Sequence, residues 1–131
     1  MARRRSEPSP GDPAAGARRR MRRSACPVAG TLDLIGDRWT LLVVRDLLLG
    51  KRRYGEFLAS SEAIPTNILA ERLKRLEEAG LIEALPYSQR PLRFEYRLTP
   101  TGRELGPIVR AVAAWGLAHV PDTRAAALPP D

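Results

Sequence analysis

Apolar residues recur every three or four positions along five stretches of the chain, which is the pattern of amphipathic helices. Proline and glycine mark several of the ends. Pro27 stands in a first turn, where proline is favoured, and Gly50 and Gly80 each follow the last apolar position of a stretch. The pattern therefore predicts five helices, at residues 26–36, 39–50, 51–61, 64–79 and 100–120.

The period changes from helical to alternating between the fourth and fifth helices. Residues 81–87 and 93–99 have the composition of strands, and in the second of them Phe94, Tyr96 and Leu98 alternate with charged residues. Residues 88–92 join the two strands through a proline. We expect a β-hairpin with a basic tip, whose alternating apolar side chains point inward.

Three short helices, a hairpin with a charged tip and flanking helices at both ends indicate an α+β fold, the winged helix-turn-helix. The flanking N- and C-terminal helices are predicted to be dimerisation helices. The chain should comprise one domain at residues 26–120, a disordered basic tail at 1–25 and a disordered C-terminal tail at 121–131. Met21 offers a second start for the native chain.

Residues 64–79 would form the helix that enters the major groove of DNA. Its leucines face inward at helical spacing, and a polar face with small side chains is left outside. Asparagine can pair with adenine and threonine can touch a thymine methyl, so the N-terminal part of this face could contact bases. The alternative is an ordinary amphipathic helix with a solvated face. The candidate base-contacting residues are Thr66, Asn67 and Ala70, whereas Lys74 would lie nearer the phosphates.

Basic residues elsewhere are candidates for contacts with the DNA backbone. Arg90 and Arg93 of the hairpin could enter a minor groove or contact a phosphate, or they could simply be solvated turn charges. Arg75 would lie near phosphates. Lys51, Arg52 and Arg53 at the start of the third helix could clamp phosphates or could be a charged helix start.

Charge and composition exclude several classes of protein. Residues 1–25 hold eight arginines against two acidic residues, so this segment carries +6 of the net charge of +7. Such tails bind polyanions without sequence preference. One cysteine and one histidine are too few for a disulfide or a zinc site, so we expect no metal and no cofactor.

Enzyme and membrane functions are not expected either. The sequence has no paired carboxylates and no glycine-rich phosphate loop, which argues against an enzyme with catalytic residues. No apolar run approaches the length of a membrane span, and Arg3–Arg5 is followed by proline, glycine and acid rather than an apolar export segment. The expected location is the cytoplasm, with no membrane partner.

Several blocks of residues resemble the HxlR family of bacterial regulators. They are Cys26-Pro27, Leu32–Gly36, Trp39, Arg52–Tyr54, Phe57, Ile68–Ile82 and Phe94–Gly102. The resemblance spans residues 26–116 and implies a homodimeric, MarR-like, non-enzymatic regulator that binds double-stranded DNA near promoters. It places the base-contacting face on Thr66, Asn67, Ala70 and Lys74. The chain departs from the family pattern at Ala63 and Pro65, where family members often have glycine and a capping serine.

Cys26 is a second candidate for chemistry. A thiolate at a helix N-terminus is favoured by the helix dipole, and arginines precede it. The resemblance implies that some relatives use the equivalent cysteine to sense oxidants or electrophiles, so an oxidant or small-molecule effector is a candidate partner. Oxidation would have to end in an intersubunit disulfide, a mixed disulfide or an adduct. The alternative is a small residue that starts a helix.

The last helix is the predicted dimer interface, because it carries more apolar surface than a helix on so small a domain needs. Its interface residues would be Leu105, Ile108, Val109, Val112 and Trp115. A two-fold dimer would bind a pseudopalindrome with half-sites about 10 bp apart. A rival function is protein–protein contact without DNA. Trp39 and Trp115 suggest either a ligand pocket or core packing.

Overall fold

The computed structural model describes residues 24–125, which divide into two units between Asp37 and Arg38. The first unit contains one helix, α2 (Pro27–Ile35). Cys26 is its N-cap in extended conformation, and Pro27 fills the first turn as the sequence predicts. The predicted tails and the second start at Met21 lie almost wholly outside the described residues, so these predictions stay open.

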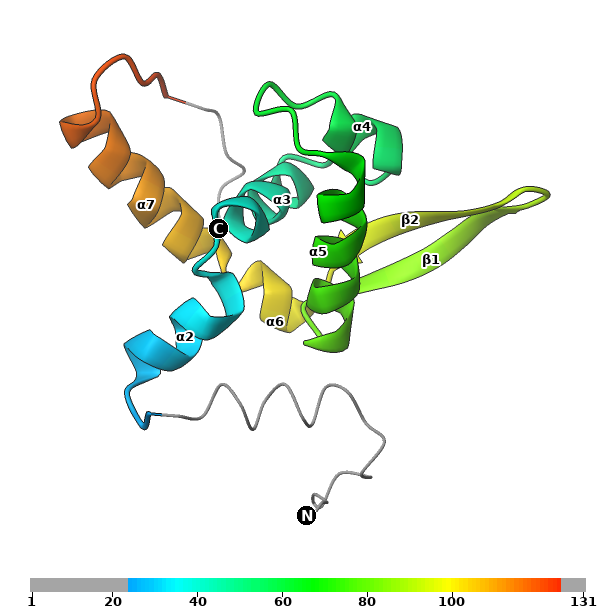
Figure 1. The fold of residues 1–131 in the computed structure, drawn as a ribbon, viewed down its shortest axis with the longest axis horizontal. Coiled ribbons are helices and arrows are strands. Elements are labelled where there is room, and N and C mark those ends of the chain that lie inside the picture. Colours follow the sequence, from blue (N-terminus) through cyan, green and yellow to red (C-terminus); the bar gives the residue numbers. More distant parts are fainter. Residues whose placement is uncertain (1–23, 126–131) are drawn as a thin grey trace. The chain divides into compact units, whose positions relative to one another are not determined.

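The second unit is a winged helix-turn-helix, which confirms the predicted α+β fold (Figure 1). Its elements are α3 (Arg38–Leu48), α4 (Tyr54–Leu58), α5 (Thr66–Glu78), β1 (Ile82–Gln89), β2 (Leu92–Leu98), α6 (Pro100–Arg103) and α7 (Gly106–His119). Figure 1 shows α5 beside α3, α4 next to the upper end of α5, and the hairpin of β1 and β2 extending well away from the helices.

The core of this unit forms where α3, α4, α5 and the base of the hairpin meet. Each element contributes apolar residues at its own period: positions three or four apart on the helices and alternate positions on the strands. The most deeply buried side chains are Phe57, Leu69, Ile82, Val44 and Thr40. Phe57 packs edge-on against Tyr96 with the ring centroids 6.4 Å apart, so α4 is fixed against the wing.

The hairpin is antiparallel and is longer than the sequence predicts. Its register pairs Ile82 with Leu98, and the strands close through a two-residue turn at Arg90-Pro91. The prediction that Phe94 points into the core is wrong, because the wing extends beyond the helices that would cover it and Phe94 is exposed. Only the base of β2, at Leu98, is buried.

The last helix was predicted to be continuous from residue 100 to 120, and this is wrong: the chain forms α6 and then α7. Pro107 lacks an N–H and cannot donate to the carbonyl of Arg103, which breaks the ladder. Gly102 in α6 also sits against the preceding loop, since a Cβ there would lie 2.0 Å from the Leu81 carbonyl oxygen. The predicted cap is confirmed: Thr99 Oγ1 accepts a hydrogen bond from the Gly102 N–H.

The predicted third helix is also shorter than expected. It was assigned to residues 51–61, whereas α4 covers only Tyr54–Leu58. Residues 51–53 instead run along the wing, where the Tyr96 N–H donates to the Arg52 carbonyl at 2.8 Å. After α4 the chain turns, and Ala63 adopts a positive φ of 58°. The sequence pattern does not predict this turn, because the spacing of apolar residues indicates which face of a helix is buried and not where the helix ends.

Candidate nucleic-acid interface

The outer face of α5 is exposed along its whole length. Leu69, Leu73 and Leu76 are buried on the opposite face, as the helical spacing predicts. The four candidate base-contacting residues, Thr66, Asn67, Ala70 and Lys74, are all exposed. They therefore share one solvent-facing surface, which we call the α5 face.

The N-terminus of α5 is open to a ligand. Pro65 is the N-cap and provides no side-chain hydrogen bond, so the first N–H groups of the helix lack a side-chain cap. The first residue of the helix is hydrogen-bonded to α4: the Tyr54 hydroxyl donates to the Thr66 carbonyl at 3.0 Å. Burial raises the pKa of Tyr54, which keeps this donor protonated. A firmly held helix N-terminus suits an anion such as a DNA phosphate.

Acidic residues limit the charge of the α5 face. Glu71 pairs with the neighbouring Arg72, and Glu77 and Glu78 lie exposed in the last turn. Arg75 is half-buried on the flank of the helix. The basic side chain on the face itself is Lys74, so attraction for a polyanion must come largely from elsewhere.

The wing tip supplies two such charges. Arg90 and Arg93 are exposed, and their side chains make no hydrogen bond or ion pair with any described residue. The turn between them is held by Ser88 Oγ, which donates to the Pro91 carbonyl at 2.8 Å. The structure therefore presents both guanidinium groups on an ordered support, at the far end of the hairpin.

The three basic residues before α4, which were predicted as a phosphate clamp, lie in different surroundings, and the clamp stays a prediction. Arg53 Nε lies 3.0 Å from Glu95 Oε2, and its guanidinium covers the Tyr87 ring at 3.8 Å from the centroid. Lys51 Nζ donates to Ser60 Oγ at 2.7 Å. Arg53 at the start of α4 thus contacts both strands of the wing.

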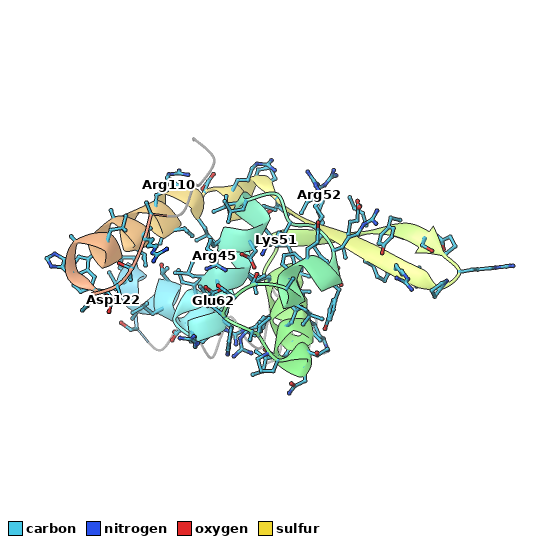
Figure 2. The ribbon with its side chains drawn as sticks, turned by 90° about the horizontal axis from the view of Figure 1, so that it is seen from above. Arg45, Lys51, Arg52, Glu62, Arg110 and Asp122 are labelled. Carbon is cyan, nitrogen blue, oxygen red and sulfur yellow. The ribbon has the colours of Figure 1, made fainter. Side chains whose placement is uncertain are left out.

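Arg52 is the third of these residues. Its backbone carbonyl accepts a hydrogen bond from the Tyr96 N–H of β2 at 2.8 Å. Figure 2 shows Arg52 at one edge of the unit and α5 at the opposite edge. Arg52 is thus not part of the α5 face, and its role as a phosphate contact stays a prediction.

A polar cluster beneath the α4–α5 connection was not predicted. Arg45 forms a two-pronged ion pair with Glu62, Nη2 to Oε1 at 2.8 Å and Nη1 to Oε2 at 3.1 Å. Arg45 also contacts Asp46, which is only 4% exposed and accepts a hydrogen bond from Ser60 Oγ. Figure 2 shows Arg45, Lys51 and Glu62 close together in the middle of the unit. The cluster ties the loop before α5 to α3.

The signal for this cluster was present in the sequence. Asp46 lies three residues after Val43 and seven after Trp39, so it occupies the apolar face of its helix. A carboxylate on a buried face requires a partner. The partners are the adjacent Arg45, Lys51 five positions later and Ser60 fourteen positions later, and helical spacing alone cannot identify them.

Glu62 makes stability dependent on acid pH. The hydrogen bonds from Arg45 lower its pKa to about 2, against roughly 4.3 in an unfolded chain. This stabilisation is complete above the unfolded value and is lost as the pH falls toward 2. At pH 7 we expect Glu62→Gln to lower the free energy of unfolding by about 1–3 kcal/mol. Urea denaturation at pH 7 and at pH 3 should show a smaller difference from wild type at pH 3.

Glu83→Gln is the matched control for this prediction. Glu83 pairs with Arg97 at 2.7 Å, but both side chains are about half exposed. Such a surface pair contributes little, and we expect a change of less than about 0.5 kcal/mol. Equal losses for the two variants, or a Glu62→Gln effect that does not depend on pH, would contradict the role assigned to the cluster.

The predicted interface residues of the last helix fall into two groups. Ile108, Val112 and Trp115 are exposed, but Val109 is only 7% exposed and belongs to the core, where α7 contacts α3. Leu105 also packs against the core. Val109 and Leu105 therefore belong to the inner stripe by which the helix lies on its own domain, and their role as partner contacts stays a prediction.

The two tryptophans have different surroundings. The cavity beside Trp39 has a volume of about 10 Å³, which is room for about one water at most and too small for an organic ligand. Trp115 is 64% exposed and lies beside His119. Among residues 24–125, no His, Cys, Asp and Glu side chains gather into a group that could hold a metal, and no helix is long and apolar enough to cross a membrane.

Cys26 lies in the first unit, at the N-terminus of α2. Its side chain is exposed and is a free thiol. Its backbone N–H donates to Ser24 Oγ at 3.1 Å, and its carbonyl accepts from Gly30, which fixes it as the residue that starts the helix. The thiol is thus accessible on an ordered backbone.

Known proteins share this arrangement. The helix-turn-helix regulator Rv3095 of Mycobacterium tuberculosis is 44% identical over 94 residues, which are 72% of this chain and 59% of Rv3095. The chain thus spans about three-fifths of the length of that relative. The structure of the transcription factor PA1607 matches with a TM-score of 0.70 and 42% identity, covering 81% of this chain and 75% of that protein.

The redox regulator HypR in its oxidised form is also similar, with a TM-score of 0.66 and 36% identity over 77% of this chain and all of that chain. The family model described as HxlR-like helix-turn-helix matches residues 34–124, which include every element from α3 to α7. Proteins of this family are transcriptional regulators rather than enzymes. The chain belongs to the HxlR-like helix-turn-helix family.

Proposed function

We propose that this protein is a transcriptional regulator that binds a specific DNA sequence as a homodimer, in the cytoplasm, on a pseudopalindromic operator. The observation that carries the proposal is the α5 face, with exposed Thr66 and Asn67 at a helix N-terminus that has no side-chain cap. In a winged helix-turn-helix this end of the second helix contacts base edges in the major groove.

The proposed contacts divide into two kinds. Thr66, Asn67 and Ala70 would contact bases, since asparagine offers a donor and an acceptor to adenine and alanine permits close approach. Lys74, Arg75 and the wing arginines would contact the sugar–phosphate backbone, which sets affinity without selecting a sequence. Two copies related by a two-fold axis would place these surfaces about 10 bp apart.

Two substitutions should separate these contributions. Asn67→Ala should cost about 1–3 kcal/mol on the selected operator and relax the preference at one base pair. Arg90→Ala should weaken binding to all sequences and reduce the slope of log K against log salt by about 1. Binding-site selection followed by fluorescence anisotropy at several salt concentrations measures both effects.

Glu77→Ala is the control, because Glu77 is exposed at the C-terminal end of α5, away from the proposed base contacts. Unchanged DNA binding for both Asn67→Ala and Arg90→Ala would place the contacts elsewhere. The rival function, a winged helix that contacts protein alone, predicts no protected DNA in a footprint at any protein concentration that keeps the chain soluble.

We also propose that Cys26 makes DNA binding responsive to oxidants. Two observations favour it: the thiol is exposed at a helix start, and HypR, a relative with the same fold, is a redox regulator. Diamide should change the operator affinity of the wild type and leave Cys26→Ser unaffected. Non-reducing electrophoresis would show whether the product is an intersubunit disulfide. Identical responses of the two proteins to diamide would exclude the switch.

A further inference from the structure

An aromatic cleft lies on the second unit between the start of α4 and the wing. Its volume is about 330 Å³, within the roughly 300–1,000 Å³ typical of small-molecule sites. All three tyrosines of the chain and one of its two phenylalanines line it: Tyr54, Tyr87, Tyr96 and Phe94. The core packing described above needs only one of these rings, that of Tyr96 against Phe57.

The wing side of the cleft is apolar and open to solvent. Tyr87 and Phe94 are each 38% exposed, and Leu92 beside them is 57% exposed. On the α4 side, Tyr54 is half-buried. Single exposed apolar side chains are common on protein surfaces, whereas several that gather in one cleft indicate a binding site.

Arg53 places a guanidinium group in this cleft in a fixed orientation. It is stacked on the Tyr87 ring, and its Nε pairs with Glu95. Its two Nη atoms form no hydrogen bond or ion pair with any residue that the structure describes. Because the group is already held, it loses little freedom on binding, and its two Nη atoms can donate to both oxygens of a carboxylate.

The charges of the lining favour an anion. Aromatic rings alone would also suit a quaternary ammonium cation. The described residues that line the cleft include Arg53 and Arg93 and no acidic side chain. Glu95 offsets the charge of Arg53 from outside the lining, whereas Arg93 makes no ion pair with any described residue. One positive charge remains, which disfavours a cation and favours an anion.

We propose that this cleft binds a small planar aromatic anion, with its ring system on Tyr54 and Phe94 and its charged group at Arg53, and that the bound ligand weakens operator binding. An inorganic anion would leave the rings uncovered, so the ligand that fits has a flat apolar body. Stacked or edge-on contacts with the exposed rings add to the energy of burying that body.

The effect on DNA rests on the proposed function, whereas the binding site itself does not. The cleft adjoins both elements that would contact DNA: Tyr54 donates to the Thr66 carbonyl at the start of α5, and Arg93 is a proposed backbone contact. A bound anion lowers the positive potential at these groups and repels the phosphates. The ligand and DNA should therefore weaken each other's binding by the same factor.

The test of the site is a ¹⁹F NMR titration of the full chain, without DNA, with 6-fluoro-2-naphthoate. The neutral (6-fluoro-2-naphthyl)methanol and the corresponding trimethylammonium cation serve as comparison ligands. The naphthoate should bind with a dissociation constant below about 1 mM, and each comparison ligand at least about fivefold more weakly. Inorganic phosphate at equal concentration should not displace the naphthoate.

Two variants separate the charged contact from the ring contact. Arg53→Gln should weaken the naphthoate by about five- to tenfold and the alcohol by less than about twofold, with part of the loss recovered in Arg53→Lys. Phe94→Ala should weaken both ligands by about three- to fivefold. Arg97→Gln is the matched control: Arg97 pairs with Glu83 on the wing and is as exposed as Arg53, but lies outside the cleft. It should bind the naphthoate like wild type.

The test of the regulatory effect is fluorescence anisotropy on the selected operator. Saturating naphthoate should raise the operator dissociation constant by about three- to tenfold in wild type, and by less in Phe94→Ala at the same concentration.

Several results would overturn the proposal. The site is refuted if the alcohol or the ammonium cation binds as well as the naphthoate, if inorganic phosphate displaces it, or if Arg53→Gln and Phe94→Ala, shown to be folded by thermal unfolding, both bind it like wild type. An operator affinity that naphthoate does not change would refute the regulatory effect. A chain that binds naphthoate but no DNA would refute the proposed function and the regulatory effect, and would leave the site standing.

Discussion

Replacing Leu69 by alanine is expected to lower the free energy of unfolding by about 3–5 kcal/mol, because the side chain is completely buried and the truncation leaves a cavity. Leu69 lies on the buried side of α5, opposite the α5 face, and belongs to the core cluster of the unit. For a domain of this size the loss is a large fraction of the total stability. Urea denaturation followed by circular dichroism measures it.

Leu92→Ala is the matched control, with the same atoms removed from an exposed position near the wing tip. It should change the free energy of unfolding by less than about 0.5 kcal/mol. Similar losses for the two variants would mean that α5 is not held by its leucine stripe. The Leu69 side chain does not reach the surface and cannot contact DNA. We therefore expect Leu69→Ala to lower operator binding only in proportion to the fraction of protein that is unfolded.

The sequence predicts those parts of the fold that depend on local period. Examples are the leucine stripe of α5, the strand alternation near Leu98 and the cap at Thr99. The residues that form each of these features are only a few positions apart in the sequence, so their spacing predicts the feature. The base-contacting candidates of α5 belong to the same class. Once the buried stripe is known, the exposed face follows from the geometry of the helix.

What the sequence did not predict depends on partners that are distant along the chain. Arg53 looks like a free cation until Glu95 and Tyr87 of the wing fold against it. Asp46 looks like an isolated acid until Ser60 and Lys51 reach it. In both cases the sequence shows a charged residue. Its role depends on a contact with another element, and the hydrophobic period does not determine which residues of two elements meet.

The last helix illustrates the same limit for an apolar stripe. Counting apolar positions on residues 105–115 gave one surface, whereas the structure divides them into a core side and an exposed side. At 100° per residue, Ile108, Val112 and Trp115 lie within about 60° of one another, and Val109 lies to one side of them. The exposed three form the α7 stripe, and we infer that a second copy of the chain covers it.

If the proposed homodimer forms through the α7 stripe, Val112→Asp should convert it into a monomer. Val112 is 57% exposed in the middle of the α7 stripe, so a carboxylate there would be buried unpaired at a two-fold interface, at a cost that such an interface cannot offset. Loss of the second half-site contact should weaken binding to a full operator by about 100-fold or more, with affinity for a single half-site unchanged. Light scattering and anisotropy on the two duplexes measure these effects.

Ala114→Asp is the control that separates the α7 stripe from general effects of charge on this helix. Ala114 is exposed on the same helix but lies more than 90° around it from Val112, outside the stripe. It should leave the dimer and the operator affinity as in wild type. A Val112→Asp protein that stays dimeric would show that the partner contacts a different surface, and monomers from both variants would mean that α7 tolerates no charge on either side.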